Sequence, residues 1–547
     1  MKRILISLSL LIACVATSTA QVRSDVASVN KNIKLFADIL KRLNANYVDS
    51  LDLDRIVNRG IDAMLYELDP YTEYFSPTET KEFLASNSGE YGGIGSFIAA
   101  RDGYVYFSGP REGSPADRAG IRTGDVILSI DGADALGMKV DEVSSRLKGN
   151  RGSKVTVKVK RPYVADSLIT FEIERDIISV PAMTYSGVVA PGVGYIGLSQ
   201  FSEKSAEEVR KALLSLINDH HITSLVLDLQ GNGGGYLQSA IKILGLFLPK
   251  GTKVLSTKGF NGVDDNVYTT DTKPIAPDMP LVVLTDGETA SAAEITAGAL
   301  QDLDRAVIVG TRTFGKGLVQ STFPMTDNGL LKITTSKYYI PSGRLIQARR
   351  YEGGTTSEIP DSLTHEFSTQ GGRTVRDGRG ISPDIEITYD NPGRLVYNLV
   401  VDNWVGDFAT RYAAEHPEAP ALDSIAVTDT IYAQFKRSIV PERLNYDRMS
   451  DESIKILREV ATTEGYMTPE VEEQIAVLER LMKHSLDADL NIQRRQVEPY
   501  LVRALAQRYY YERGEAAAAL RSDKSLKEAL EILADPEHYN SILHPAK

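Results

Sequence analysis

The sequence has one cysteine and one tryptophan among its 547 residues. A single cysteine excludes an internal disulfide framework, and no grouping of cysteines and histidines has the spacing of a metal site. Basic residues are also in short supply, because 61 lysines and arginines face 73 acidic residues, giving a formal net charge of −12. That balance argues against nucleic acid as a partner. We therefore expect a protein that works with neither a metal nor another cofactor.

The apolar run near the start of the chain is too short to cross a membrane as an ordinary helix. Residues 4–16 are mostly apolar and follow a positively charged start, which is the pattern of a secretory signal peptide. The small residues up to Ala20 predict cleavage there, so that the mature chain begins at Gln21. Alternatively, the segment ending at Cys14 resembles a lipobox, and a lipid anchor at that cysteine would attach the protein to a membrane. Both interpretations predict an exported protein of the periplasm or cell envelope.

A serine near the middle of the chain stands where a strand turns into a helix. Residues 281–284 are apolar and rich in β-branched side chains, which predicts a buried strand, and residues 290–300 predict a helix. Ser291 therefore lies at a helix N-terminus, where free N–H groups and the helix dipole stabilise an anion. We interpret it as a nucleophile. The alternative is a capping box, in which Ser291 and Glu294 only satisfy N–H groups at the helix start.

Lys316 lies between two glycines, 25 residues after Ser291, and we interpret it as the general base. A lysine takes up a proton only when it is neutral, so its pKa must be lowered by burial or by nearby charge. Gln320 follows four residues later and would orient the lysine. A phosphate-binding loop ending at Lys316 is rejected, because Gly317 follows where that loop needs a hydroxyl for Mg²⁺. The alternative bases are three histidines distant in sequence, namely His220, His221 and His365.

A glycine-rich segment supplies candidate donors for an oxyanion. Residues 223–229 predict a buried strand, and residues 230–235, which follow it, include four glycines. Glycines between a strand and a helix let backbone N–H groups point at a ligand. We expect an oxyanion hole formed by the N–H groups of Gly234, or Gly235, and Ala292. The alternatives are a plain flexible turn and a phosphate nest.

Three segments together resemble the C-terminal-processing, or tail-specific, serine protease family. They are DLQGNGGG at 228–235, TASAAEI at 289–295 and TFGKGLVQ at 313–320. Members of that family have a Ser–Lys dyad, often aided by a glutamine, on a crotonase-like core with an inserted PDZ domain. The resemblance therefore implies an acyl-enzyme route for this chain as well.

The resemblance also assigns roles residue by residue. Ser291 matches the nucleophile, Lys316 the base and Gln320 the helper, and Glu294 matches a nearby supporting group. One position departs from the pattern, because the family commonly has arginine where this chain has Gln230. That departure affects a supporting contact and leaves the dyad assignment as it is.

Residues 90–175 are rich in predicted strands and resemble the PDZ domains of proteases, most closely over residues 113–132. A glycine loop precedes that stretch and is formed by Gly93, Ile94, Gly95 and Ser96. The resemblance implies that the N–H groups of this loop bind the terminal carboxylate of a peptide, which adds to the sheet as an extra strand. We expect partners with flexible apolar C-termini. The alternative is a PDZ domain with a purely structural role.

The remaining sequence predicts helices on both sides of this central part. Residues 26–64 and 394–547 have helical patterns, and helices of the second segment are candidates for a homo-oligomer contact. Residues 341–384 are polar and rich in glycine, proline and arginine, which predicts an elaborated surface loop. We expect five segments: a signal peptide at 1–20, a helical N-terminal region at 21–87, a PDZ domain at 88–175, a serine protease core at 176–393 and a helical C-terminal region at 394–547.

The predicted fold class is α/β, with a crotonase-like protease core, an inserted PDZ domain and helical terminal regions. The predicted function is that of a serine endopeptidase that cleaves envelope or secreted proteins near their C-termini. The alternative is a secreted PDZ-containing binding protein with a non-catalytic protease-like core. A binding role gives no reason for the trio of Ser291, Lys316 and Gln320, so the enzyme is favoured. A related acyl-CoA enzyme is disfavoured by the predicted signal peptide and PDZ insertion.

Overall fold

The computed structural model describes residues 26–164, 167–444, 449–482 and 485–545. The predicted signal peptide, with its alternative processing positions Cys14 and Ala20, lies outside these residues. No helix in the described ranges is long and apolar enough to cross a membrane. The chain forms two compact units. The first contains the residues up to Ser76 with Gln320–Thr334 and Tyr351–Thr356, and the second contains the rest.

A six-stranded sheet forms the centre of the second unit, in the order β10-β11-β12-β15-β16-β23. β10 pairs with β11 antiparallel, and the other strands run parallel. Every residue of β11, β15 and β16 is buried, as expected for strands covered on both faces. The bounds are Met183–Ala190 (β10), Val193–Leu198 (β11), Ser224–Asp228 (β12), Leu281–Thr285 (β15), Val307–Gly310 (β16) and Ile385–Glu386 (β23).

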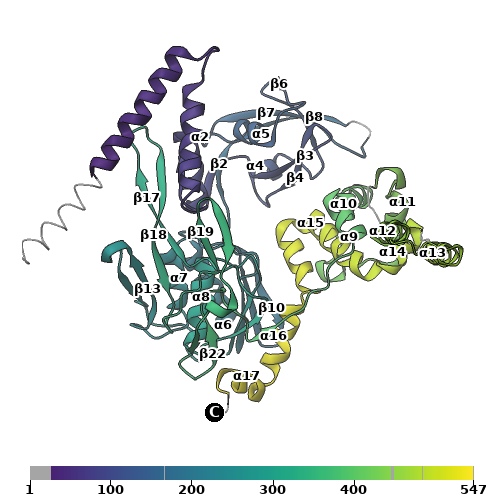
Figure 1. Cartoon of the computed structure of the whole chain (residues 1–547). Coiled ribbons are helices and arrows are strands. Elements are labelled where there is room, and N and C mark those ends of the chain that lie inside the picture. Colours follow the sequence, from purple (N-terminus) through teal and green to yellow (C-terminus); the bar gives the residue numbers. More distant parts are fainter. Residues whose placement is uncertain (1–25, 165–166, 445–448, 483–484, 546–547) are drawn as a thin grey trace, which may run out of the picture. The chain divides into compact units, whose positions relative to one another are not determined.

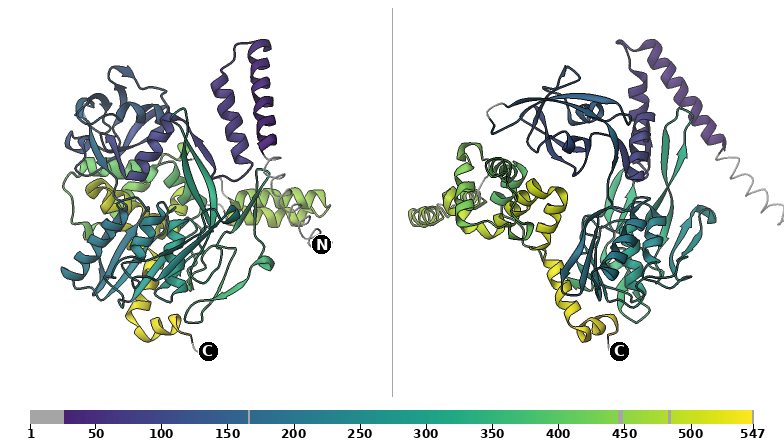
Figure 2. Two further views of the ribbon diagram at one scale, coloured as in Figure 1. Left: turned by 90° about the vertical axis from the view of Figure 1, so that its left-hand side faces the viewer. Right: turned by 180° about the vertical axis from the view of Figure 1, so that it is seen from behind.

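Helices cover both faces of this sheet. Successive strand residues point to opposite sides, so neighbouring residues of one strand pack against different helices. Leu225 and Leu281 belong to the core that includes residues of α6, α7 and α8. Their neighbours Val226 and Val282 pack instead with residues of α16 and α17, the last helices of the chain (Figures 1 and 2). These helices are Ser205–Asn218 (α6), Leu237–Leu244 (α7), Ala292–Asp302 (α8), Lys524–Ala534 (α16) and Pro536–Leu543 (α17). The C-terminal end of the chain is thus part of the α/β core.

A second sheet has its own apolar core and the strand order β3-β4-β5-β7-β8, with β6 paired to β5. β2 pairs with β9, so the chain enters and leaves this part side by side, as an inserted domain requires. β3 is an edge strand. The bounds are Glu90–Gly93 (β2), Ser96–Arg101 (β3), Tyr104–Pro110 (β4), Pro115–Arg118 (α4), Val126–Ile130 (β5), Ala133–Asp134 (β6), Val140–Leu147 (α5), Lys154–Lys160 (β7), Leu168–Glu174 (β8) and Asp176–Ser179 (β9).

The C-terminal region is helical, as predicted. Its helices α9 to α11, α14 and α15 share an apolar core that contains Phe408, Phe435 and Leu501. The bounds are Arg394–Val401 (α9), Trp404–Glu415 (α10), Asp429–Ser438 (α11), Met449–Thr463 (α12), Pro469–Leu481 (α13), Leu486–Ile492 (α14) and Arg494–Leu520 (α15).

The prediction that residues 341–384 form a surface loop is wrong for several of its polar residues. Arg344 is 1% exposed and lies 2.9 Å from Asp302, and buried Arg373 lies 2.8 Å from both Asp304 and Asp384. Buried charges persist when they are paired, and these pairs attach the segment to the end of α8. Further strands in and before this region are Lys253–Gly259 (β13), Asn266–Thr269 (β14), Arg349–Glu352 (β19), Thr355–Glu358 (β20), Glu366–Ser368 (β21) and Thr374–Arg376 (β22).

The first unit contains two N-terminal helices and parts of a hairpin. Residues 26–46 and α2 (Leu53–Tyr66) are helical, and β1 (Glu73–Phe75) pairs antiparallel with β18. A turn around Asn328 closes the hairpin, since Met325 N–H donates to Gly329 O and Asn328 has a φ of +67°. The hairpin strands are Leu318–Pro324 (β17) and Leu330–Tyr339 (β18), and Pro77–Ser88 (α3) begins the second unit.

Candidate active site

Ser291 directly precedes α8 and follows β15 after a short turn at residues 286–290, so the predicted strand-to-helix turn is confirmed. Its backbone has φ +56° and ψ −116°, a region that residues with a Cβ seldom adopt. Such a conformation costs about 1–3 kcal/mol and persists only where the surroundings enforce it. A strained turn that presents a serine at a helix N-terminus is typical of a nucleophile.

Glu294 enforces this geometry from within the core, where it is fully buried. Its Oε2 accepts hydrogen bonds from Ser291 N at 2.9 Å and from Lys316 N at 2.8 Å. Its Oε1 accepts from Thr313 Oγ1 at 2.5 Å and from Gly315 N at 2.7 Å. Because one oxygen binds both amides, the backbones of the predicted nucleophile and base lie no farther apart than two hydrogen-bond lengths. The structure therefore brings Ser291 and Lys316 together.

The capping box proposed as the alternative for this pair is present, but it is only part of what Glu294 does. Burial raises the pKa of Glu294, while the hydrogen bonds from Thr313, Lys316 and Ser291 oppose that rise. A cap needs only the bond to Ser291. Through its bonds to Thr313, Gly315 and Lys316, Glu294 also holds the segment that carries Lys316. The sequence alone did not reveal this second role.

The glycine loop lies against the nucleophile. A Cβ on Gly234 would stand 2.7 Å from Ser291 Cβ and 2.9 Å from Ala292 N, so only glycine fits here. The two predicted oxyanion donors therefore lie together beside Ser291. In this structure Gly234 N–H donates to Asn232 Oδ1 at 2.9 Å, so one predicted donor already has an intramolecular acceptor. The oxyanion hole stays a prediction.

Asn232 and Tyr338 are site residues that the sequence reading missed. Asn232 is fully buried, and its Nδ2 donates to Leu198 O at 2.7 Å while its carbonyl accepts from Ala290 N at 2.9 Å. Tyr338, on β18, donates to Ser291 O at 3.3 Å. Burial raises the pKa of Tyr338 well above its ordinary value, so its hydroxyl keeps its proton. The only available signal for Asn232 was its place among the glycines, and Tyr338 had none.

Gln320 lies in β17 and belongs to the first unit, where its Nε2 donates to Thr334 Oγ1 at 3.1 Å. Its role toward Lys316 stays a prediction. The alternative bases lie elsewhere: His220 and His221 are exposed at the end of α6, and exposed His365 lies 3.1 Å from Asp377. Among the described residues, no group of three or more potential ligands could hold a metal ion.

The predicted carboxylate loop joins β2 to the edge strand β3. Gly95 has a φ of +74°, and a Cβ there would come within 2.5 Å of Ser114 Cβ. The carbonyls of Ile94 and Gly95 accept from Ala116 N at 2.8 Å and Arg111 N at 3.0 Å, which fixes the orientation of the loop. An open strand edge beside such a loop has the form of a site for peptide addition.

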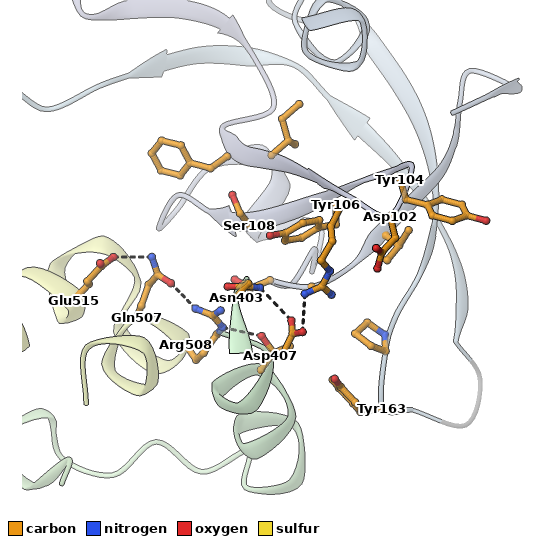
Figure 3. A pocket seen from close by; sticks show the side chains of 18 of the residues that line it. Asp102, Tyr104, Tyr106, Ser108, Tyr163, Asn403, Asp407, Gln507, Arg508 and Glu515 are labelled. Carbon is orange, nitrogen blue, oxygen red and sulfur yellow. Dashed lines mark hydrogen bonds and ion pairs between the residues drawn. The ribbon is translucent and has the colours of Figure 1, made fainter. Parts of the chain in front are cut away.

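A cavity of about 570 Å³ contains none of the predicted site residues and lies between β3–β4 and the C-terminal helices (Figure 3). Arg101 and Asp407 form an ion pair of 2.6 Å across it, and Gln507 donates to Glu515 at 2.7 Å. Burial lowers the pKa of Arg508 to about 10. These polar groups are thus bound by one another.

A strained serine tied to a lysine segment, with a second sheet inserted ahead of it, defines the class of serine proteases with a peptide-binding domain. Comparison with known families agrees: residues 192–360 match peptidase family S41, residues 106–161 a PDZ domain, and residues 395–533 the probable PDZ-protease C-terminal helical domain. A carboxy-terminal-processing protease of Bartonella bacilliformis is 36% identical over 320 residues, which cover 58% of this chain and 73% of that protein. The chain belongs to peptidase family S41.

Other relatives give the same picture. A probable CtpA-like serine protease of Staphylococcus aureus is 32% identical over 64% of this chain and 71% of its own length. Among solved structures, a photosystem II D1 C-terminal processing protease is 26% identical over 64% of this chain and 85% of that chain, with a TM-score of 0.35. The PDZ domain of a Vibrio cholerae carboxy-terminal protease, solved in complex with peptide, is 30% identical over 17% of this chain and 99% of that chain, with a TM-score of 0.16. The family matches and the Bartonella and Staphylococcus relatives confirm the predicted family and its PDZ domain.

Proposed function

We propose that the protein is a serine endopeptidase with a Ser291–Lys316 dyad. The observation that carries this proposal is that Glu294 Oε2 binds the backbone N–H groups of both residues. In the reaction, Lys316 takes the proton of Ser291 Oγ, and the oxygen attacks the peptide carbonyl. The amine leaves with a proton, and water then hydrolyses the ester of the acyl-enzyme. Gln320 orients Lys316, and the core is crotonase-like.

The developing oxyanion is bound by Ala292 N–H together with Gly234 N–H. The second donor must leave Asn232 Oδ1 for this purpose, so we infer that the loop changes conformation when substrate binds. Once in place, a donor of this kind contributes about 3–4 kcal/mol to transition-state stabilisation. Gly235, the next residue, is the alternative donor.

Substrates are exported or envelope proteins whose flexible apolar C-termini add to the edge of β3. Gly93, Ile94, Gly95 and Ser96 meet the terminal carboxylate. The protein is exported by its N-terminal segment, with cleavage at Ala20 or a lipid anchor at Cys14, and copies associate through the C-terminal helices.

The test uses a reporter protein with a flexible apolar tail. Ser291→Ala and Lys316→Ala should each abolish cleavage and leave the circular dichroism spectrum unchanged. Lys337→Ala, at an exposed position on β18, is the matched control and should cleave normally. Normal turnover by either dyad variant would remove the assignment. Binding of the tail without any cleavage by the parent would favour the non-catalytic binding protein.

A further inference from the structure

The C-terminal end of the chain reaches the glycine loop beside Ser291 through a single carboxylate. Asp523 is the N-cap of α16, and its Oδ1 accepts from Leu526 N at 3.0 Å. Its other oxygen, Oδ2, accepts from Gln230 Nε2 at 3.0 Å. The same side chain therefore starts a C-terminal helix and holds the first residue of the loop.

A second contact fixes the other end of the Gln230 amide. Tyr389 donates its hydroxyl proton to Gln230 Oε1 at 3.1 Å. The Tyr389 oxygen also lies 2.6 Å from Oγ of Ser525, which is fully buried in α16. Because Asp523 and Ser525 belong to the same helix start, the contacts form a closed ring around Gln230. The ring allows one orientation of the amide.

From Gln230 the constraint passes to the nucleophile along a short path. Gly231 N–H donates to Asp286 at 3.0 Å, and the Asn232 carbonyl accepts from Ala290 N at 2.9 Å, next to Ser291. Two residues of backbone thus separate the ring from a direct contact with the nucleophile turn. Meanwhile α16 is held on the sheet by Leu526 and its apolar neighbours, so Asp523 is a fixed reference point.

We propose that Asp523 is a positioning residue for the peptidase reaction: through Gln230 it anchors the start of the glycine loop, so that only the Gly234 end has to rearrange when the oxyanion is bound. This inference rests on the proposed function of Ser291. It makes the C-terminal helix α16 a part of the catalytic unit. Asp523 does not touch substrate.

The experiment separates positioning from helix capping. Asp523→Ser keeps a side chain that caps α16 but is too short to reach Gln230. Gln230→Met keeps the shape of Gln230 and removes its hydrogen bonds. Each variant should lower kcat about tenfold with little change in KM, because one hydrogen bond to a charged group is lost. The double variant should be no slower than the slower single variant, because both changes break the same link.

Asp535→Ser is the matched control, since Asp535 caps α17 by accepting from the Glu537 and His538 amides and has no recorded link to the loop in the described structure. It should leave kcat unchanged. Values of kcat within twofold of the parent for both Asp523→Ser and Gln230→Met would overturn the proposal, as would independent, multiplying losses in the double variant.

A second readout needs no activity and therefore distinguishes failure of this inference from failure of the proposed function. In the Ser291→Ala background, Asp523→Ser should speed amide hydrogen exchange in residues 230–235 at least tenfold, whereas Asp535→Ser should not. Unchanged exchange in that segment would reject the positioning role. If Asp523→Ser speeds exchange but Ser291→Ala still cleaves substrate, the link between Asp523 and the loop is supported and the Ser291–Lys316 dyad is rejected.

Discussion

The two loops that flank Ser291 are held in different ways. The Lys316 segment is tied to Glu294, a fully buried carboxylate in the next helix that accepts four donors. The start of the glycine loop is tied by partly exposed contacts to the carboxylates of Asp286 and Asp523, and Asp523 is nearly 300 residues away. Fully buried contacts to a charge are costly to break, while partly exposed ones are screened by solvent and cost less. We infer that the base side of the site is permanent and that the oxyanion side can be adjusted.

Glu294→Gln tests the permanent side and should have the largest effect. An amide offers one oxygen, and its NH₂ group must face two of the donors now bound by carboxylate. Two unsatisfied buried donors cost roughly 2–6 kcal/mol of unfolding free energy. Denaturant unfolding should show that loss, and cleavage should be abolished. Glu288→Gln, at an exposed position of the same turn, should change neither property. Near-normal stability and turnover in Glu294→Gln would mean that Glu294 is only a helix cap.

Gly234→Ala tests the adjustable side. A Cβ at this position would lie 2.7 Å from both Ala290 O and Ser291 Cβ, in a backbone with φ +98°. We expect turnover to fall at least a hundredfold, about 3 kcal/mol, while the protein still folds. Gly233→Ala is the matched control, because nothing lies within 4 Å of a Cβ there. If the two variants had equal kcat values, the glycine loop would not be close to the reacting atoms.

Asp228→Asn tests the base of the same loop through pH. Desolvation raises the pKa of Asp228 to about 7, with Asp523 adding to the rise, against hydrogen bonds from Tyr195 and Gln230. The folded state therefore binds this proton more tightly than the unfolded chain, whose aspartate pKa is about 3.9. The contribution of this group to the unfolding free energy is at its maximum below about pH 4 and is lost as the pH rises toward 7.

The parent should lose about 2 kcal/mol of unfolding free energy over this range through Asp228, after allowance for its partial exposure. Denaturant unfolding at several pH values should show a flatter profile for Asp228→Asn. Asp271→Asn, at an exposed position, is the comparison and should keep the parent profile. Identical slopes for all three proteins would show that Asp228 stays ionised throughout.

The sequence predicted the parts of the site that depend on local pattern. The strand before Ser291, the helix after it and the glycine loop were all confirmed, because each follows from periodicity and turn residues a few positions apart. Glu294 was found, but only as a cap. Its bond to Lys316 could not be read, because no spacing rule connects a helix to a loop 22 residues later.

Contacts over longer separations were missed for the same reason. Asp523 looks like any helix cap in the sequence, and its bond to Gln230 exists only because α16 packs on the sheet. The sequence predicts a surface position for Arg344 and Arg373, because composition does not show that they form buried ion pairs with Asp302 and Asp304. Tertiary pairing decides such cases, and it leaves no local signal.

At the edge of β3, recognition of the substrate should be weaker than at the chemical site and separable from it. A free carboxylate at the end of a substrate can be met by several N–H groups of the Gly93–Ser96 loop, and bonds of this kind are stronger than neutral ones. A peptide ending in an amide should therefore be cleaved about tenfold less efficiently than the same peptide ending in an acid, measured as kcat/KM.

Two glycine variants locate this preference. Gly95→Ala would place a Cβ 2.5 Å from Ser114 Cβ and should remove the difference between the acid and amide peptides. Gly113→Ala also has a positive φ, of +68°, but nothing lies within 4 Å of its Cβ, so the preference should persist. Both changes place alanine at a positive φ and so add similar backbone strain. Only Gly95→Ala also disturbs the loop expected to bind the carboxylate. Equal cleavage of the acid and amide peptides by the parent would mean that the PDZ domain has a purely structural role and does not select free C-termini.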